Sequence, residues 1–152
     1  MKKAKKSLSQ NFLKDKNICK KIVQLADITN KSFVLEIGPG YGFMTDEIIN
    51  KKPKKLYLIE KDNNITIFLK KKYNKFKNIE IRNEDFLNFN LDNFKKLIII
   101  SNLPYNVSTK IILYLFKFNK NIDKTILMIQ KEVAEKFNYN LPNMNKYKFL
   151  TR

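Results

Sequence analysis

An amide, a proline and an aromatic ring follow directly on an apolar run in the middle of the chain. The run is Leu97–Ile100, and Asn102, Pro104 and Tyr105 come just after it. The length and β-branched content of the run are typical of a strand buried on both faces of a parallel sheet. Ligands of such sheets bind beyond the carboxyl ends of the strands, so we expect these three residues to hold a ligand, with the amide accepting its hydrogens.

A second chemical signal is the clustering of glycine. The only three glycines of the chain, Gly38, Gly40 and Gly42, lie together in EIGPGYG, into which the strand-like run Phe33–Ile37 leads. Glycines permit a tight turn and a close approach of the backbone to a ligand, although many turns carry them for structural reasons alone. Their concentration in a chain otherwise without glycine favours a ligand loop. No Gly-Lys-Ser/Thr follows, which excludes a Walker loop.

Carboxylates near this loop indicate which cofactor it would bind. Glu36 would repel a pyrophosphate at the start of the next helix but would favour an ammonium or sulfonium group, and S-adenosyl-L-methionine carries both. Glu60 ends the second apolar run and could accept hydrogen bonds from two ribose hydroxyls, or be an ordinary solvated glutamate. Asp85, in NEDF, could accept from the adenine amine, and the neighbouring Glu84 is an alternative on chemistry alone.

With such a cofactor, the segment around Asn102 suits methylation of an adenine amine. The Asn102 side-chain oxygen and the backbone carbonyl of Leu103 can each accept one amine hydrogen, which directs the nitrogen lone pair towards the methyl group. The proton can leave after transfer, which suits a chain without histidine. Pro104 fixes the turn, and Tyr105 offers a stacking face worth about 1–3 kcal/mol to an extruded base. The alternative is a strand-ending turn with the tyrosine in the core.

Apolar runs alternate with helical spacing along the chain, which predicts a doubly wound α/β fold with a mostly parallel sheet of about five strands. The expected strands are Phe33–Ile37, Leu56–Glu60, Ile79–Ile81, Leu97–Ser101 and Thr125–Ile129, and the expected helices are Asp15–Ala26, one opening at Ile65–Leu69, Ser108–Phe118 and Lys131–Phe137. After Phe137 the periodicity is lost.

The composition limits the number of domains, the cellular compartment and the kinds of site that we expect. At 152 residues and 43% apolar content we expect one domain with a packed core. The single Cys19 excludes an internal disulfide and favours a reducing compartment, so we expect a cytoplasmic location. The absence of histidine removes histidine metal sites, and we expect no metal. No apolar run is long enough to span a membrane, and the basic start lacks the apolar stretch of a signal peptide.

The net charge of +17 indicates a polyanionic partner, since lysines near phosphates release condensed counterions. A compositional explanation competes with this one. Nearly all the basic residues are lysine, and the chain is rich in Asn, Ile, Phe and Tyr, all encoded by A- and T-rich codons.

Together, SQNFL (Ser9–Leu13), EIGPGYG, Glu60, NEDF, NLPYNVST and MIQKEVAEKF (Met128–Phe137) resemble the ribosomal RNA adenine dimethyltransferase family, and within it the small-subunit rRNA branch. The resemblance implies a Rossmann-like S-adenosyl-L-methionine-dependent methyltransferase in which Asn11 and Leu13 help to close over the cofactor. It implies that Gly38, Glu60, Asp85 and Asn102 contact the cofactor or the target amine. The implied substrate is two adjacent adenosines near the 3′ end of small-subunit rRNA, each methylated twice during ribosome biogenesis by a monomer acting on a pre-30S particle.

The chain departs from that family at its end. Family members continue through further strands and a helical RNA-binding domain, so residues 1–152 would be the S-adenosyl-L-methionine-binding domain, with a basic arm at 1–13 and a truncated end at 138–152. We expect KYKFLTR to continue the helix after QKEVA, which would leave Thr125–Ile129 as an apolar sheet edge. A later motif that forms the second wall of the base pocket would be missing, so catalysis by this chain would be weak.

Other functions compete with this interpretation. A large-subunit rRNA methylase of the macrolide-resistance type shares QNF and the Asn-x-Pro-Tyr turn, but NLPY with QKEVA favours the small-subunit branch. DNA-adenine and glutamine methylases use Asn-Pro-Pro-Tyr, and Leu103 counts against them. A non-catalytic assembly factor that holds precursor rRNA through its lysines is the alternative from another class.

Overall fold

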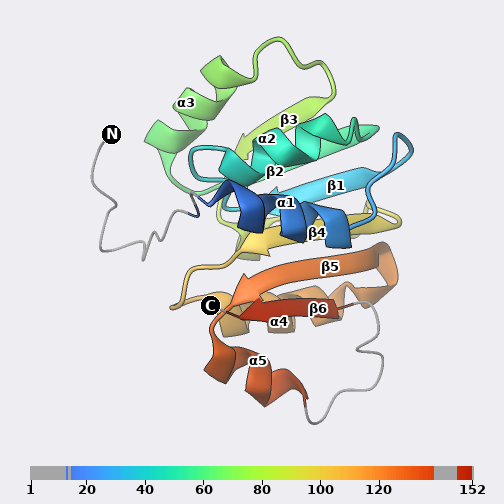
Figure 1. The fold of residues 1–152 in the computed structure, drawn as a ribbon, viewed down its shortest axis with the longest axis vertical. Coiled ribbons are helices and arrows are strands. Elements are labelled where there is room, and N and C mark those ends of the chain that lie inside the picture. The colour runs from blue at the N-terminus through green and yellow to red at the C-terminus, as the bar shows by residue number, and fades with distance from the viewer. Residues whose placement is uncertain (1–12, 14, 139–146, 152) are drawn as a thin grey trace.

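A computed structural model of the chain describes residues 13, 15–138 and 147–151. These residues form one six-stranded sheet in the order β3-β2-β1-β4-β5-β6, and every neighbouring pair of strands is parallel (Figure 1). The strands are β1 (Phe33–Ile37), β2 (Lys55–Glu60), β3 (Ile79–Asn83), β4 (Leu97–Asn102), β5 (Ile122–Ile129) and β6 (Tyr147–Thr151). The predicted doubly wound, mostly parallel α/β fold is confirmed.

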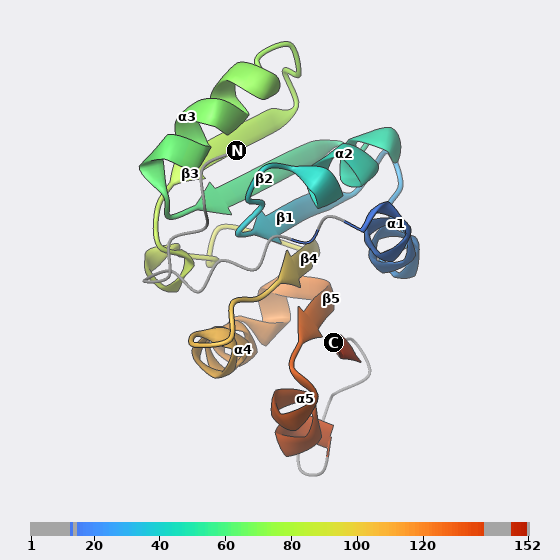
Figure 2. The ribbon, with the colours of Figure 1, turned by 60° about the vertical axis from the view of Figure 1, so that its left-hand side comes forward.

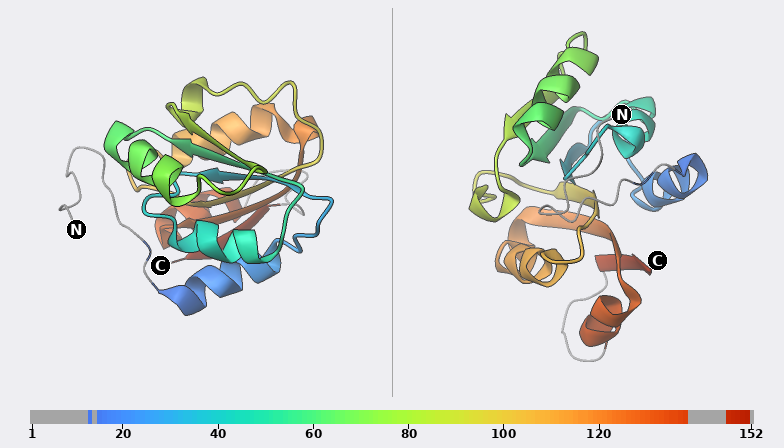
Figure 3. Two further views of the ribbon diagram at one scale, coloured as in Figure 1. Left: turned by 90° about the horizontal axis from the view of Figure 1, so that it is seen from above. Right: turned by 90° about the vertical axis from the view of Figure 1, so that its left-hand side faces the viewer.

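Helices cover both faces of the sheet. One face carries α1 (Lys16–Leu25), α2 (Phe43–Asn50) and α3 (Asn63–Lys72); the other carries α4 (Ser108–Lys117), α5 (Lys131–Asn138) and the short 3₁₀ helix η2 (Phe86–Asn88). A second 3₁₀ turn, η3 (Asn119–Asn121), precedes β5. The view from above in Figure 3 shows α4 across the sheet from α1 and α2. No helix in the described ranges is long and apolar enough to cross a membrane.

Local capping explains where two of these helices begin. Asp15 accepts hydrogen bonds from the backbone of Asn17 and Ile18, and Asp62 accepts from Asn64 and Ile65. Such caps satisfy backbone donors that the first helical turn leaves unpaired. Asp62 therefore starts α3 immediately after β2 ends, which brings the chain sharply back across the sheet.

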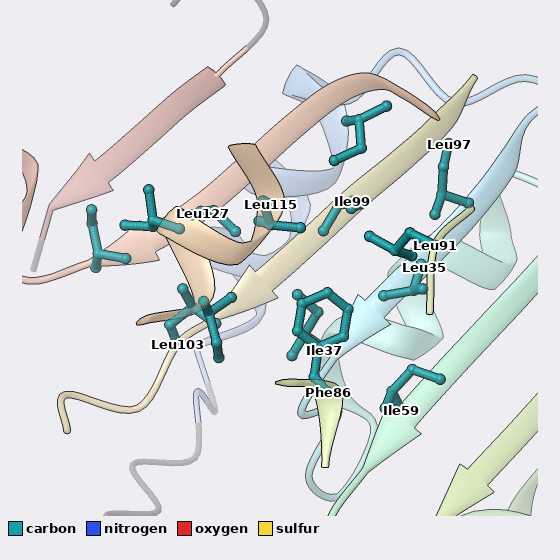
Figure 4. Packing of buried hydrophobic residues seen from close by; sticks show 14 of the residues in the cluster. Leu35, Ile37, Ile59, Phe86, Leu91, Leu97, Ile99, Leu103, Leu115 and Leu127 are labelled. Atoms are coloured by element: carbon teal, nitrogen blue, oxygen red, sulfur yellow. The ribbon is translucent and has the colours of Figure 1, made fainter. Parts of the chain in front are cut away.

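The core is divided into two layers by the sheet. Figure 4 shows the layer beneath α4 and η2, where Leu35, Ile37 and Ile99 from the central strands pack with Phe86 and Leu115. The second layer packs α1, α2 and α3 on the opposite face. Residues 97–101 of β4 are all buried, as expected for a strand covered on both faces.

The strand order reverses between β1 and β4, which lie side by side at the centre of the sheet. At the end of this pair the Ser101 hydroxyl donates to the carbonyl oxygen of Ile37 at 2.6 Å. The next residues along each strand are Gly38 and Asn102. In open parallel sheets this reversal point is where ligands bind, beyond the carboxyl ends of the strands.

The end of the described chain differs from the prediction. KYKFLTR was expected to continue a helix, but Tyr147–Thr151 forms β6, which pairs in parallel with β5 from Thr125 to Ile129. The prediction that β5 would be left as an apolar edge is therefore wrong, because β6 covers it. Phe149 packs on one core layer and Leu150 on the other, so this short strand adds apolar contacts on both faces of the sheet.

Candidate active site

A pocket of about 200 Å³ lies beyond the carboxyl ends of β1, β2 and β4. It is lined by the glycine loop, the end of β2, the start of η2 and the turn after β4. The predicted site residues Leu13, Glu36, Gly38, Gly40, Glu60, Asp85, Asn102 and Pro104 all line it. The structure thus brings together side chains that are far apart in the sequence.

The glycine loop adopts backbone conformations that favour glycine. Gly38, Gly40 and Gly42 have φ angles of 65°, 56° and 83°. These lie in the left-handed region, which residues with a Cβ rarely adopt. A Cβ added at Gly38 would meet nothing within 4 Å, so the space beside it is open to a ligand. The loop therefore has the shape and the clearance that close approach of a ligand requires.

Polar side chains from the end of α3 and the start of α2 support the glycine loop. The Tyr73 hydroxyl shares its single proton between the carbonyl oxygen of Gly42, 3.0 Å away, and the Asp46 carboxylate, 2.6 Å away. Lys72 donates to the Tyr41 carbonyl oxygen at 3.2 Å and forms an ion pair with Asp46 at 2.8 Å. A Cβ at Gly42 would lie only 2.2 Å from the Tyr73 hydroxyl. The end of α3 thus fixes the loop and the start of α2.

Glu36 lies at the bottom of the pocket with only 1% of its surface exposed. Its carboxyl accepts a hydrogen bond from the Thr45 hydroxyl at 2.6 Å. Burial is the main cause that raises the pKa of this carboxyl to about 8. The Thr45 hydrogen bond and the Lys72 ammonium oppose the shift, and the nearby carboxylates of Asp46 and Glu60 add to it. A buried carboxyl that has no ion-pair partner among the described residues is suited to a positively charged ligand group, which would stabilise its ionised form.

Glu60, at the end of β2, is oriented by the backbone. One carboxylate oxygen accepts the Gly40 N–H at 3.2 Å and the other accepts the Asp62 N–H at 2.8 Å. Burial raises the pKa of Glu60, while these two hydrogen bonds oppose the shift. Each carboxylate oxygen can accept a second hydrogen bond, so the pair can still receive the two hydroxyls of a ribose.

Asp85 lies across the pocket from the loop and is partly engaged. Lys61 donates to one of its oxygens at 2.7 Å, and the Leu87 N–H donates to the other at 3.1 Å. The Lys61 ammonium holds the pKa of Asp85 below its usual value. Glu84 also lines the pocket, so the choice between Asp85 and Glu84 as acceptor for an adenine amine stays open.

The turn after β4 divides its side chains between pocket, core and solvent. Asn102 and Pro104 line the pocket, whereas the Leu103 side chain is fully buried in the core, with its N–H donating to the Met128 carbonyl oxygen. Tyr105 is 42% exposed and is not among the pocket-lining residues. The alternative that Tyr105 belongs to the core is therefore excluded.

Residues that the sequence did not single out complete the pocket. Its apolar walls come from Ile37, Phe43, Met44, Ile59, Phe86, Leu87, Val107 and Ile111, each one to a few residues from a predicted position. Lys61, which also lines the pocket, was not predicted. Neither were Lys72 and Tyr73, which lie outside the pocket and support the glycine loop. Asn11 lies outside the described residues. Within the described ranges no group of three or more Cys, Asp or Glu side chains is arranged to hold a metal ion.

Comparison with known proteins gives consistent results. A family model described as ribosomal RNA adenine dimethylase matches residues 1–151. Over 148 residues the chain is 47% identical to "Ribosomal RNA small subunit methyltransferase A" of Pelagibacter ubique, covering 94% of this chain and 55% of that protein. The protein of the same name from Buchnera aphidicola is 42% identical over 153 residues, covering 97% of this chain and 57% of that one. The chain thus spans about half the length of the curated relatives it matches.

Solved structures agree in fold. The chain is similar to a dimethyladenosine transferase from Plasmodium falciparum, with a TM-score of 0.75 and 30% identity over 86% of this chain and 47% of that one. It is similar to the 23S rRNA methyltransferase ErmE, with a TM-score of 0.76 and 27% identity over 84% of this chain and 51% of that one.

Proposed function

Since the chain belongs to the ribosomal RNA adenine dimethylase family, we propose that it binds S-adenosyl-L-methionine and methylates adenine amines of small-subunit rRNA. The observation that carries this proposal is the position of Asn102, which lines the same pocket as the glycine loop, Glu36 and Glu60. The pocket thus combines a place for a cationic nucleoside cofactor with an acceptor for an amine. The names of the relatives favour small-subunit over large-subunit rRNA.

The residues of the pocket fit this cofactor. The glycine loop would lie against the cofactor, and Glu36 would face its positive charge. Glu60 would accept hydrogen bonds from its ribose hydroxyls. Asp85 or Glu84 would accept from the adenine amine, and Leu13, with Asn11, would close the pocket. When bound, the cofactor supplies a methyl group on a positively charged sulfur.

The chain's own groups would orient the nucleophile. The Asn102 side-chain oxygen and the Leu103 carbonyl accept the two hydrogens of the adenine amine, which directs its lone pair into the pocket. A general base is not required, because the proton becomes acidic once the nitrogen is alkylated and can pass to water. Tyr105, being exposed beside the pocket, can stack on a base that has left its helix.

Further details follow from the family resemblance. We propose that the substrate is two adjacent adenosines near the 3′ end of small-subunit rRNA, each methylated twice on a pre-30S particle by a monomer. We propose that residues 1–152 belong to the cofactor-binding domain, with a basic arm at 1–13.

The test compares wild type, Asn102→Ala and Asn30→Ala on purified small subunits with labelled S-adenosyl-L-methionine. Asn30 is an exposed asparagine just before β1, at the amino-terminal ends of the strands and therefore on the side of the sheet away from the pocket. We expect measurable methylation from wild type and Asn30→Ala, and none from Asn102→Ala. Calorimetry with S-adenosyl-L-methionine, performed on each protein, verifies that the cofactor pocket is intact.

Equal incorporation by wild type and Asn102→Ala would refute the catalytic role of the NLPY turn. If RNA binding then persisted, the non-catalytic assembly factor would be the better explanation. Failure of wild type to bind S-adenosyl-L-methionine would refute the assignment of the pocket.

A further inference from the structure

The segment from Asn63 to Asn78, which comprises α3 and the turn after it, is strongly basic. It contains five lysines and no acidic residue. Lys72 forms an ion pair with Asp46. The other four, Lys70, Lys71, Lys75 and Lys77, are exposed, and no ion pair joins them to any carboxylate in the described ranges. Their charge is therefore available to an outside anion.

The same segment exposes apolar side chains. Seven large apolar side chains are exposed among the described residues. Four of them, Phe43, Ile67, Phe68 and Phe76, lie in this segment or at the facing start of α2. Ile67 is 59% exposed, Phe68 42% and Phe76 41%. Apolar side chains grouped on a surface in this way are typical of a binding site.

We define the α3 face as Ile67, Phe68, Lys70, Lys71, Lys75 and Phe76. It is continuous with the rim of the pocket, because the Phe68 ring contacts the ring of Tyr41, which lines the pocket, at a centroid distance of 5.5 Å. Figure 2 shows α3 at the margin of the molecule, with no other helix over its outer side. An extended ligand could therefore pass from the α3 face to the pocket.

We propose that the α3 face binds single-stranded RNA next to the nucleotide whose base enters the pocket. Its lysines would contact phosphates, and Phe68 and Phe76 would stack on bases. Interleaved lysines and aromatic rings are how proteins bind single strands without reading their sequence. Lysine is depleted at protein–protein interfaces, which favours RNA over a protein partner. This inference rests on the proposed function, since it assumes an RNA substrate.

The experiment measures the affinity of the full chain for an unstructured RNA oligonucleotide across a range of salt concentrations. The test variant is Lys70→Ala/Lys71→Ala/Lys75→Ala. The matched control, Lys20→Ala/Lys117→Ala/Lys120→Ala, removes the same charge from exposed lysines on α1, α4 and η3. A second pair, Phe68→Ala and Leu113→Ala, compares exposed apolar side chains on opposite faces of the sheet.

Each lost phosphate contact reduces the slope of log affinity against log salt by about 0.7, so the test variant should lose about 2 in slope. With 1 M salt as the reference, the affinity at 0.1 M salt should therefore fall about fivefold for each lost contact, or roughly 100-fold for three. The control should change affinity only slightly. Phe68→Ala should weaken binding by about 5- to 150-fold, and Leu113→Ala should not.

Equal losses in the two triple variants would overturn the proposal, because the lysines would then act only through net charge. Retained affinity in the test variant, or a wild-type chain with no measurable affinity for RNA, would also overturn it. Binding of S-adenosyl-L-methionine is measured on every variant. If the cofactor binds and methylation depends on Asn102 while the α3 face proves irrelevant, the inference fails and the proposed function stands.

Discussion

Glu36 should couple cofactor binding to the release of a proton. In the free chain its pKa is about 8, because the side chain is buried among other acids with one hydrogen-bond donor. At neutral pH it therefore carries a proton. If a cationic ligand requires the carboxylate, affinity should follow the ionised fraction, which is about one-tenth at pH 7 and about one-hundredth at pH 6. We expect affinity to rise about tenfold from pH 6 to 7 and to level off above pH 8.

Calorimetry of S-adenosyl-L-methionine binding in buffers of different ionisation heat counts the protons released. The amino group of the ligand also titrates, near pH 7.7–8.0. In Glu36→Gln this amino group still titrates but residue 36 does not, so the difference between the two proteins reports the proton of Glu36. Wild type should release about one proton more than Glu36→Gln at pH 7. Identical pH profiles for the two proteins would refute the reasoning about Glu36.

The same carboxyl should affect stability with a defined sign. Its folded pKa of about 8 lies above the ordinary value of 4.5, so its protonated form is favoured by folding. The resulting stability is fully present below pH 4.5 and is lost as pH rises through 8, a difference of about 5 kcal/mol. Urea unfolding of Glu36→Gln should show a flatter dependence on pH, with the variant gaining stability relative to wild type between pH 4.5 and 8 and no further above that. An unchanged profile would contradict the pKa assignment.

Three further changes test the support of the pocket. Tyr73→Phe removes the hydroxyl that supports the glycine loop, so it should weaken cofactor binding by about 1–2 kcal/mol, or about 5- to 30-fold. The control is Tyr114→Phe, which also loses a hydrogen bond from a hydroxyl to a backbone carbonyl. It should lower the melting temperature without changing the affinity for the cofactor. Equal affinity losses would show that the effect is general destabilisation. Glu60→Ala should weaken binding by about 1.5–3 kcal/mol per lost hydrogen bond, measured by calorimetry, and an unchanged affinity would exclude it as the ribose acceptor. Lys61→Ala frees Asp85 from an exposed ion pair worth at most about 1 kcal/mol, so affinity should rise by up to about fivefold; a fall would mean that Lys61 itself contacts the cofactor.

The sequence predicted the central strands well because their signals are local. Leu97–Ile100 is apolar throughout, and its burial on both faces follows from that alone. The pocket was also largely predictable, since its polar residues directly follow such strands and parallel strands bring their ends to one edge. Glu36 and Gly38 were found for this reason.

The missed features depend on contacts between distant segments. β6 has five residues and two of the last three residues of KYKFLTR are polar, so no local pattern marks it; its pairing with β5 decides its conformation. Tyr73 lies 31 residues from the glycine loop that it supports, and nothing around it in the sequence points to that contact. The helix α2 was not placed because its eight residues follow the glycine loop with no side-chain cap to mark its start.

The seam between β1 and β4 also bears on how the protein folds. Ser101 and Ile37, which are joined across it, are 64 residues apart in sequence, and every other strand pair joins segments less than half as far apart. Closing so long a loop is the entropically costliest pairing in the sheet and the slowest to nucleate. The pocket lies across this seam, with the glycine loop on one side and Asn102 on the other. The ability to bind a ligand should therefore appear only with the last phase of refolding, and a ligand that spans the seam should slow its opening.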